Sequence, residues 1–223
     1  MNMKKTSLLL ASQSPRRREL IALLGVDFEI ASANVDESLF PNESPADYVT
    51  RLAEAKARAF PPTGAVKGGR VVIGSDTVVV DIGETLGKPR DTRDAELTLR
   101  RLRGRTHQVY TAVAVYDETS KKIFSELSIS DVPMRDYSDA EIKSYIATGD
   151  PMDKAGGYAI QHPDFQPVEK FTGCFASVMG LPLCHLARIL RKAGVPVDAK
   201  MPLRCQSALN YACEVSEAIL RGK

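Results

Sequence analysis

The sequence lacks a marked excess of charge of either sign. Its 223 residues include 30 lysines and arginines against 28 aspartates and glutamates, which gives a formal net charge of +2 at pH 7. A dedicated nucleic-acid-binding protein usually carries a basic excess along one face. We therefore expect no nucleic-acid partner, and we expect the arginines of residues 92–103 to form a solvated helix face.

Long hydrophobic runs are also missing. No segment approaches the roughly 20 apolar residues that a membrane-spanning helix needs. The leucine run after Lys4 and Lys5 is too short for a signal peptide, and Ser14 and Pro15 end it. We therefore expect a cytoplasmic protein without a membrane partner.

Cysteine is scarce, and its spacing suggests no particular site. The last quarter of the chain holds all four cysteines, without a Cys-x-x-Cys pair or paired histidines beside them: Cys174, Cys184, Cys205 and Cys213. Reduced, mostly buried thiols are the expectation. The remaining composition, 43% hydrophobic and 26% charged, is that of an ordinary globular protein. A chain of this length can form one large α/β domain or two lobes around a cleft.

The first chemical signal is a basic turn near the N-terminus. An apolar run that predicts a buried strand leads to Ser14, a suitable N-cap, and to Pro15, which suits the first helical position. Three consecutive arginines then stand at the helix end where cations oppose the macrodipole. Helix stability does not explain them, so we interpret Arg16 and Arg17, with the hydroxyls of Ser12 and Ser14, as a phosphate site. The alternative is a solvated basic turn.

The second signal is an acidic residue inside an apolar strand. Residues 71–80 are apolar on both sides of a Gly-Ser-Asp-Thr motif, which is typical of a central strand buried on both faces. An unpaired carboxylate there is costly, so Asp76 needs a metal ion, a cation or hydrogen-bond donors. Gly74 allows another group to approach the backbone closely. The alternative is an aspartate at a strand end that is hydrogen-bonded to a turn.

Three further charged residues stand at the ends or borders of expected elements. Glu37 follows another acidic residue at a strand end, where carboxylates can hold a hard cation or belong to a solvated loop. Lys56 lies at the border of the apolar face of a helix, where lysines usually extend to solvent. Lys88 follows a hairpin or strand return, close to the start of the next helix.

Residues 150–161 are too rich in glycine and charge for a plain connection. Lys154 can form a structural ion pair with Asp153 or face phosphate oxygens. Gln161 follows a short strand expected at residues 158–160. Its amide can read the edge of a base through a paired donor and acceptor.

Five separate motifs, in this order, resemble those of the Maf-like nucleotide pyrophosphatases: SQSPRR at 12–17, GSDT at 74–77, GKP at 87–89, DKAG at 153–156 and VMGLP at 178–182. The resemblance predicts a domain of this family at residues 1–194. Residues 195–223 are then a C-terminal extension, in which the spacing of the apolar residues predicts one amphipathic helix. It implies an α/β fold related to the inosine-triphosphate pyrophosphatases, with a mixed sheet and two lobes around a deep active-site cleft.

The resemblance also implies divalent-metal-dependent cleavage of a nucleoside triphosphate to the monophosphate and pyrophosphate. By motif match, Asp76 is the catalytic acidic residue and a ligand of Mg²⁺ or Mn²⁺, and Glu37 lies near the metal as a second ligand. The substrate-binding residues that we predict are Ser12, Ser14, Arg16, Arg17, Lys56, Thr77, Lys88, Lys154 and Gln161.

Within the family, residues 153–161 resemble the branch that acts on dTTP and UTP. Arg16, Thr77 and Gln161 match the positions that mark this branch, whereas residues 157–159 read Gly-Tyr-Ala where Ala-Tyr-Gly is commoner. Two alternatives stay open: a nucleotide-binding regulator of septum formation and cell division without turnover, and the same chemistry on a modified or non-standard purine nucleotide. A homodimer is compatible with the resemblance, because the family often forms one.

Overall fold

One mixed sheet organises the chain, whose computed structural model describes residues 6–61 and 69–222. Its strand order is β2-β1-β3-β5-β6, and β4 pairs with the far end of β3. β1 runs parallel to β2 and β3, whereas the other pairings are antiparallel. The strands are β1 (Ser7–Ala11), β2 (Phe28–Ala31), β3 (Arg70–Asp81), β4 (Glu84–Leu86), β5 (Thr106–Asp117) and β6 (Lys122–Pro133). The predicted α/β fold with a mixed sheet is confirmed.

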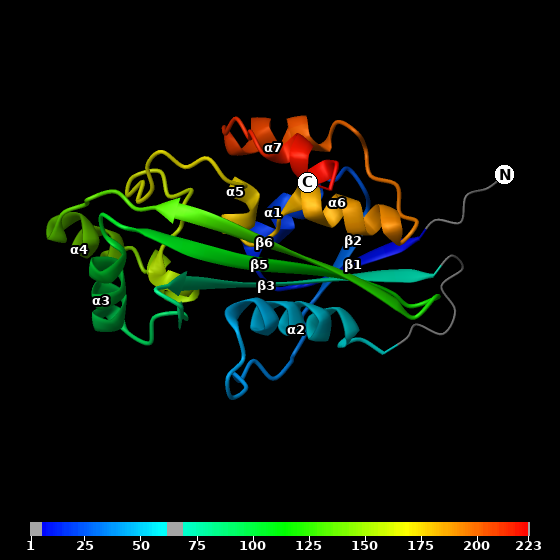
Figure 1. The fold of residues 1–223 in the computed structure, drawn as a ribbon, viewed down its shortest axis with the longest axis horizontal. Helices are drawn as coiled ribbons and strands as arrows, with labels where there is room; N and C mark the ends of the chain where they lie inside the picture. The colour runs from blue at the N-terminus through cyan, green and yellow to red at the C-terminus, as the bar shows by residue number, and fades with distance from the viewer. Residues whose placement is uncertain (1–5, 62–68, 223) are drawn as a thin grey trace.

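Helices cover both faces of the sheet and one of its ends (Figure 1). α2 lies on one face, α1, α5, α6 and α7 lie on the other, and α3 and α4 lie at the end. The long strands β3, β5 and β6 run from the part of the sheet between α2 and α6 to the end beside α3 and α4. The helices are α1 (Pro15–Ala22), α2 (Pro45–Arg58), α3 (Thr92–Leu102), α4 (Asp139–Ala147), α5 (Phe175–Val178), α6 (Leu183–Lys192), α7 (Met201–Leu209) and α8 (Ser216–Leu220), with short 3-10 turns η1 (Asp150–Asp153) and η2 (Ala155–Gly157). In the described part of the chain, no helix has the length and apolar character to cross a bilayer.

The side chains of the strands alternate between two apolar layers, as the pleat of a strand requires. Val113 and Val115 of β5 join the larger core, which also holds residues of α1 and α6. Ala112 and Ala114, between and beside them, face α2. Because Ala112 and Ala114 have small side chains, α2 can lie close to β5 at this point.

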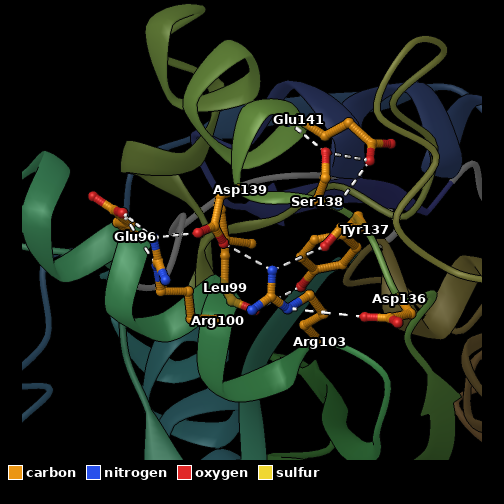
Figure 2. Close-up of polar contacts among 9 residues, drawn as sticks. All are labelled: Glu96, Leu99, Arg100, Arg103, Asp136, Tyr137, Ser138, Asp139 and Glu141. Carbon is orange, nitrogen blue, oxygen red and sulfur yellow. Dashed lines mark hydrogen bonds and ion pairs between the residues drawn. The ribbon is translucent and has the colours of Figure 1, made fainter.

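Hydrogen bonds hold the start of α4 against the end of α3 (Figure 2). Arg103 donates to the carbonyl oxygen of Tyr137 at 3.1 Å and to Asp139 at 2.8 Å. Ser138 and Glu141 form a capping box that satisfies two backbone N–H groups at the start of α4. The buried Tyr137 hydroxyl donates to the Leu99 carbonyl at 2.8 Å. The end of the sheet beside α3 and α4 is therefore firmly held.

The C-terminal residues differ from the single amphipathic helix that the sequence predicts. Asn210 adopts a left-handed conformation, with φ 47°, which ends α7, and α8 follows only at Ser216. Met201 is buried in the main core. Arg204 donates to the carbonyl oxygens of Leu23 and Leu24 at 2.9 and 3.2 Å, at the end of α1. The division of the chain at residue 194 stays a prediction.

Candidate active site

A pocket of about 570 Å³ opens where β1 and β2 end and β3 continues beyond them. β1 pairs with β3 only as far as Ile73, and β4 begins to pair with β3 at Val79. Between these points, one edge of β3 pairs with no strand among the described residues, and Asp76 lies there. Crevices of this kind, at the carboxyl ends of parallel strands, are the usual ligand sites of open α/β sheets. Every predicted site residue lines the pocket: Ser12, Ser14, Arg16, Arg17, Glu37, Lys56, Asp76, Thr77, Lys88, Lys154 and Gln161.

One lysine holds the two acidic residues of the pocket. The Lys56 Nζ lies 2.7 Å from Asp76 Oδ1 and 2.7 Å from Glu37 Oε1. The side chain of Asp76 is 11% exposed and that of Glu37 57%. Burial raises the pKa of Asp76 above its usual value of 3.8, although the charges of Lys56 and Arg17 oppose this shift. Burial has the same effect on Glu37 and is the largest single influence there, but the hydrogen bond to Lys56 and the charges of the surrounding cations together outweigh it and lower the pKa of Glu37.

The same two carboxylates fit a divalent metal ion in their chemistry. Mg²⁺ is usually bound by one or two carboxylates together with phosphate oxygens and water, rather than by a cage of protein ligands. Among the described residues no group of three histidines, cysteines or carboxylates is placed to hold a metal. Asp76 and Glu37, which direct oxygens at one cationic position, meet the smaller requirement of Mg²⁺ or Mn²⁺.

Arg17 is anchored in the wall of the pocket. Its Nε donates to the Gly180 carbonyl at 2.8 Å, and its NH2 donates to the Thr77 hydroxyl at 3.2 Å. The Thr111 hydroxyl lies 3.1 Å from that of Thr77, so the predicted base contact of Thr77 would use an oxygen that already has two neighbours. Burial lowers the pKa of Arg17 below its usual value, and the charge of Asp76 opposes this shift.

The turn between β1 and α1 has the form that the sequence predicts. Ser14 is the N-cap and Pro15 takes the first helical position, yet the Ser14 side chain makes no capping bond. The hydroxyl of Ser12 accepts the Ser14 N–H at 3.2 Å. Arg16 lies 3.4 Å from Asp153 across the pocket, whereas Arg18 is exposed. Two of the three arginines thus line the pocket.

Lys154 and Gln161 lie in the same segment, but they differ in whether their side chains are available to a ligand. The Lys154 ammonium donates to the carbonyl of Asp150, to its carboxylate and to Asp153, at 2.6, 2.7 and 2.6 Å. An ammonium group has three protons, so a contact with phosphate would cost one of these bonds. Of the two interpretations of Lys154, a structural ion pair or a phosphate contact, the geometry supports the ion pair. Gln161 is exposed at the pocket.

Residues 158–160 are not the short strand that the sequence predicts. They pair with no strand of the described sheet. The reason is that the Ala159 N–H donates to the hydroxyl of Tyr145, at 3.0 Å, rather than to a neighbouring strand.

Tyr48 is a polar pocket residue that the sequence analysis did not assign to the site. Tyr48 lines the pocket, and its hydroxyl donates to the Glu37 carbonyl at 2.9 Å. It precedes Lys56 by eight residues, so both lie on one face of α2. That spacing is a signal by which it could have been found.

Comparisons with known proteins agree with the motifs. The profile of the family described as "Maf-like protein" matches residues 7–193. A dTTP/UTP pyrophosphatase of Geotalea uraniireducens is 45% identical over 190 residues, which are 85% of this chain and 96% of that protein. Proteins with the same name from Geobacter sulfurreducens and Anaeromyxobacter dehalogenans are 45% and 48% identical, over 86% and 87% of this chain and 99% and 98% of theirs.

Among solved structures, the Staphylococcus aureus Ham1 protein overlaps with a TM-score of 0.40 and 13% identity, over 58% of this chain and 72% of that chain. That overlap is too loose to bear on the function. The family profile spans most of the chain, and the three relatives align over nearly their whole length. The chain therefore belongs to the Maf-like protein family.

Proposed function

We propose that this protein hydrolyses dTTP and UTP to the nucleoside monophosphate and pyrophosphate. The observation that carries the proposal is a buried carboxylate, Asp76, in one pocket with the cationic side chains of Arg16, Arg17, Lys56 and Lys88. A triphosphate chain needs such cations around it, and a hydrolysis needs a base beside them. The names of the relatives support the same substrates for this chain.

In this proposal Asp76 orients and deprotonates the attacking water. A carboxylate whose pKa is raised accepts a proton more readily at neutral pH than an ordinary one. The water attacks the α-phosphorus in line with the leaving pyrophosphate, and the P–O bond to the β-phosphate breaks. Lys56, 2.7 Å from the same carboxylate, keeps Asp76 oriented through the step.

The cationic residues hold the leaving group. Arg16, Arg17 and Lys88 bind the β- and γ-phosphates and stabilise the charge that develops on pyrophosphate. The hydroxyls of Ser12 and Ser14 and the free N–H groups at the start of α1 contribute hydrogen bonds at the same place.

Asp76 and Glu37 would hold the metal. A bound Mg²⁺ or Mn²⁺ supplies neutralisation of the negative charge on the phosphate oxygens. Gln161 and Thr77 contact the pyrimidine through its carbonyl and N–H groups. We also propose that the protein works in the cytoplasm as a homodimer. In this proposal it binds neither nucleic acid nor a membrane.

A screen of canonical and modified nucleoside triphosphates, with Mg²⁺ or Mn²⁺, tests this function. We expect pyrophosphate, and no orthophosphate, from dTTP and UTP. Binding of nucleotide without product would favour the regulator of cell division. Faster turnover of a modified purine nucleotide would favour the purine alternative.

A further inference from the structure

The wall of the pocket at residues 158–161 is held in place by one tyrosine. Tyr145 of α4 is 2% exposed, and its hydroxyl accepts the Ala159 N–H at 3.0 Å. The same hydroxyl donates to Asp150 Oδ2 at 2.6 Å. Since residues 158–160 are buried but pair with no strand of the described sheet, this bond is a main constraint on the position of their backbone.

The bonds continue from Asp150 to the phosphate side of the pocket. Lys154, itself 7% exposed, binds the other carboxylate oxygen of Asp150 at 2.7 Å and Asp153 at 2.6 Å. Asp153 lies 3.4 Å from Arg16. An unbroken series of polar contacts therefore runs from an arginine of the phosphate site, through Lys154 and Tyr145, to the backbone of Ala159.

The ring of Tyr145 adds a second constraint on the same segment. It stacks on Phe165 with 4.3 Å between centroids, and it forms a T-shaped pair with the His162 ring with 4.8 Å between centroids. Residues 158–165 thus fold around this side chain. Removal of the hydroxyl alone would keep the ring contacts and release only the hydrogen bonds.

We propose that Tyr145, Asp150 and Lys154 are positioning residues that set the place of residues 158–161 and thereby the preference for a nucleobase. The inference rests on the proposed function, in which Gln161 reads the base. Hydrogen-bonding selectivity depends on placement to within about 0.5 Å. A segment without sheet partners needs an external support to reach this precision, and the series of bonds from Lys154 supplies it.

The variant Tyr145→Phe tests the proposal, and Tyr137→Phe is its matched control. Tyr137 is equally buried, and its ring lies 4.8 Å from the same Phe165. Its hydroxyl donates to the Leu99 carbonyl (Figure 2), and it does not line the pocket. Both variants lose one buried hydroxyl from one aromatic cluster, so a general loss of stability affects both.

Affinities for dTTP and dGTP are measured by isothermal titration calorimetry in EDTA, so that the readout does not require turnover. We expect Tyr145→Phe to lower the ratio of the dTTP to the dGTP affinity about tenfold, the value of one well-placed hydrogen bond. Tyr137→Phe should keep the wild-type ratio. An unchanged ratio in Tyr145→Phe, an equal fall in both variants, or a wild type without base preference would overturn the inference. A wild type that prefers dTTP in EDTA but releases no pyrophosphate with metal contradicts only the proposed function.

Lys154→Met separates this role from direct phosphate binding. We expect the dTTP to dGTP ratio to fall about as it does in Tyr145→Phe, while the affinity for inorganic pyrophosphate stays near that of the wild type. A weaker affinity for pyrophosphate with an unchanged base ratio would make Lys154 a phosphate ligand and overturn its part in the proposal.

Discussion

Gly74 of β3 lies against the backbone of Ala53 in α2. A Cβ atom on Gly74 would come 2.1 Å from the Ala53 carbonyl oxygen and 2.7 Å from the backbone nitrogen of Ala57. The sequence predicts a close approach at this glycine, and its partner is the helix that carries Lys56. The contact allows α2 to lie close enough to β3 for Lys56 to reach Asp76.

Gly74→Ala should therefore damage both stability and activity. Backbone atoms cannot move aside as a flexible side chain can, so α2 must shift. We expect a loss of about 1–3 kcal/mol in the free energy of unfolding, as for other overpacked sites, and a fall of about 100-fold in kcat/KM because Lys56 is displaced. Urea unfolding and a pyrophosphate-release assay measure the two effects. Gly87→Ala is the control for stability, because a Cβ there meets nothing within 4 Å; equal losses in both variants would contradict the argument.

Asp76→Asn should abolish most activity without loss of stability. Loss of the general base costs about two to four decades in rate. Burial raises the pKa of Asp76, so its stabilising contribution is present at low pH and is lost as the pH rises through the folded-state pKa. At neutral pH the ionised carboxylate is thus a cost, and asparagine should leave the melting temperature equal or higher. Near-wild-type turnover in this variant would remove Asp76 from the mechanism.

Asp81→Asn is the opposite case on the same strand. Burial raises the pKa of Asp81, but the hydrogen bonds and the positive charges of Arg101 and Arg105 together outweigh burial and bring the pKa below its usual value. Its contribution to stability is therefore present above the unfolded-state pKa and is lost as the pH falls. We expect Asp81→Asn to lose about 2 kcal/mol in the free energy of unfolding at pH 7 and to keep its turnover, since Asp81 does not line the active-site pocket.

The acid limb of the pH profile should respond to Glu37. Activity needs ionised Asp76, so kcat/KM falls as the pH drops through a pKa above 3.8. The negative charge of Glu37 contributes to that raised pKa. Glu37→Gln should therefore move the acid limb to lower pH, whatever it does to the maximum rate. The ionisation of the substrate affects the pH profiles of the wild type and of Glu37→Gln equally, so it does not contribute to the difference between them. An acid limb that stays in place or moves to higher pH would contradict the assignment of Asp76 as the base.

Much of the site follows from short stretches of sequence. A proline after an N-cap serine fixes the turn before Arg16, and an aspartate between runs of valine indicates a carboxylate that needs a partner. These are local constraints, so they can be read without knowledge of the fold. The partner of Asp76 is different: Lys56 comes from another element, and only the packing of α2 on β3 selects it from other border lysines.

Other features depend on single contacts that no local pattern indicates. From the sequence, Lys154 in a glycine-rich segment fits a phosphate site as well as an ion pair. The structure shows that its ammonium group donates its three hydrogen bonds to Asp150 and Asp153. Residues 158–160 have the composition of a strand, but the Tyr145 hydroxyl takes the place of a strand partner. Asn210 divides the C-terminal helix because asparagine tolerates the left-handed conformation, which it adopts in only some contexts.

Lys88→Ala should weaken the interaction with the triphosphate. Lys88 is exposed in the pocket and makes no hydrogen bond or ion pair within residues 6–61 and 69–222, so its ammonium group is available to a ligand. A charged hydrogen bond to phosphate is worth about 1.5–3 kcal/mol. We expect kcat/KM for dTTP to fall about 10- to 100-fold while the melting temperature stays unchanged.

The control for Lys88→Ala is Lys143→Ala, which removes an exposed lysine of α4 that does not line the pocket. Both variants change the net charge equally, so a general electrostatic attraction of the anionic substrate would weaken equally in both. A contact specific to Lys88 predicts a larger loss in its variant, and a smaller dependence of KM on salt than in the wild type. Equal kinetics in the two variants would leave Lys88 as a surface lysine and would place the binding of the leaving pyrophosphate on Arg16 and Arg17 alone.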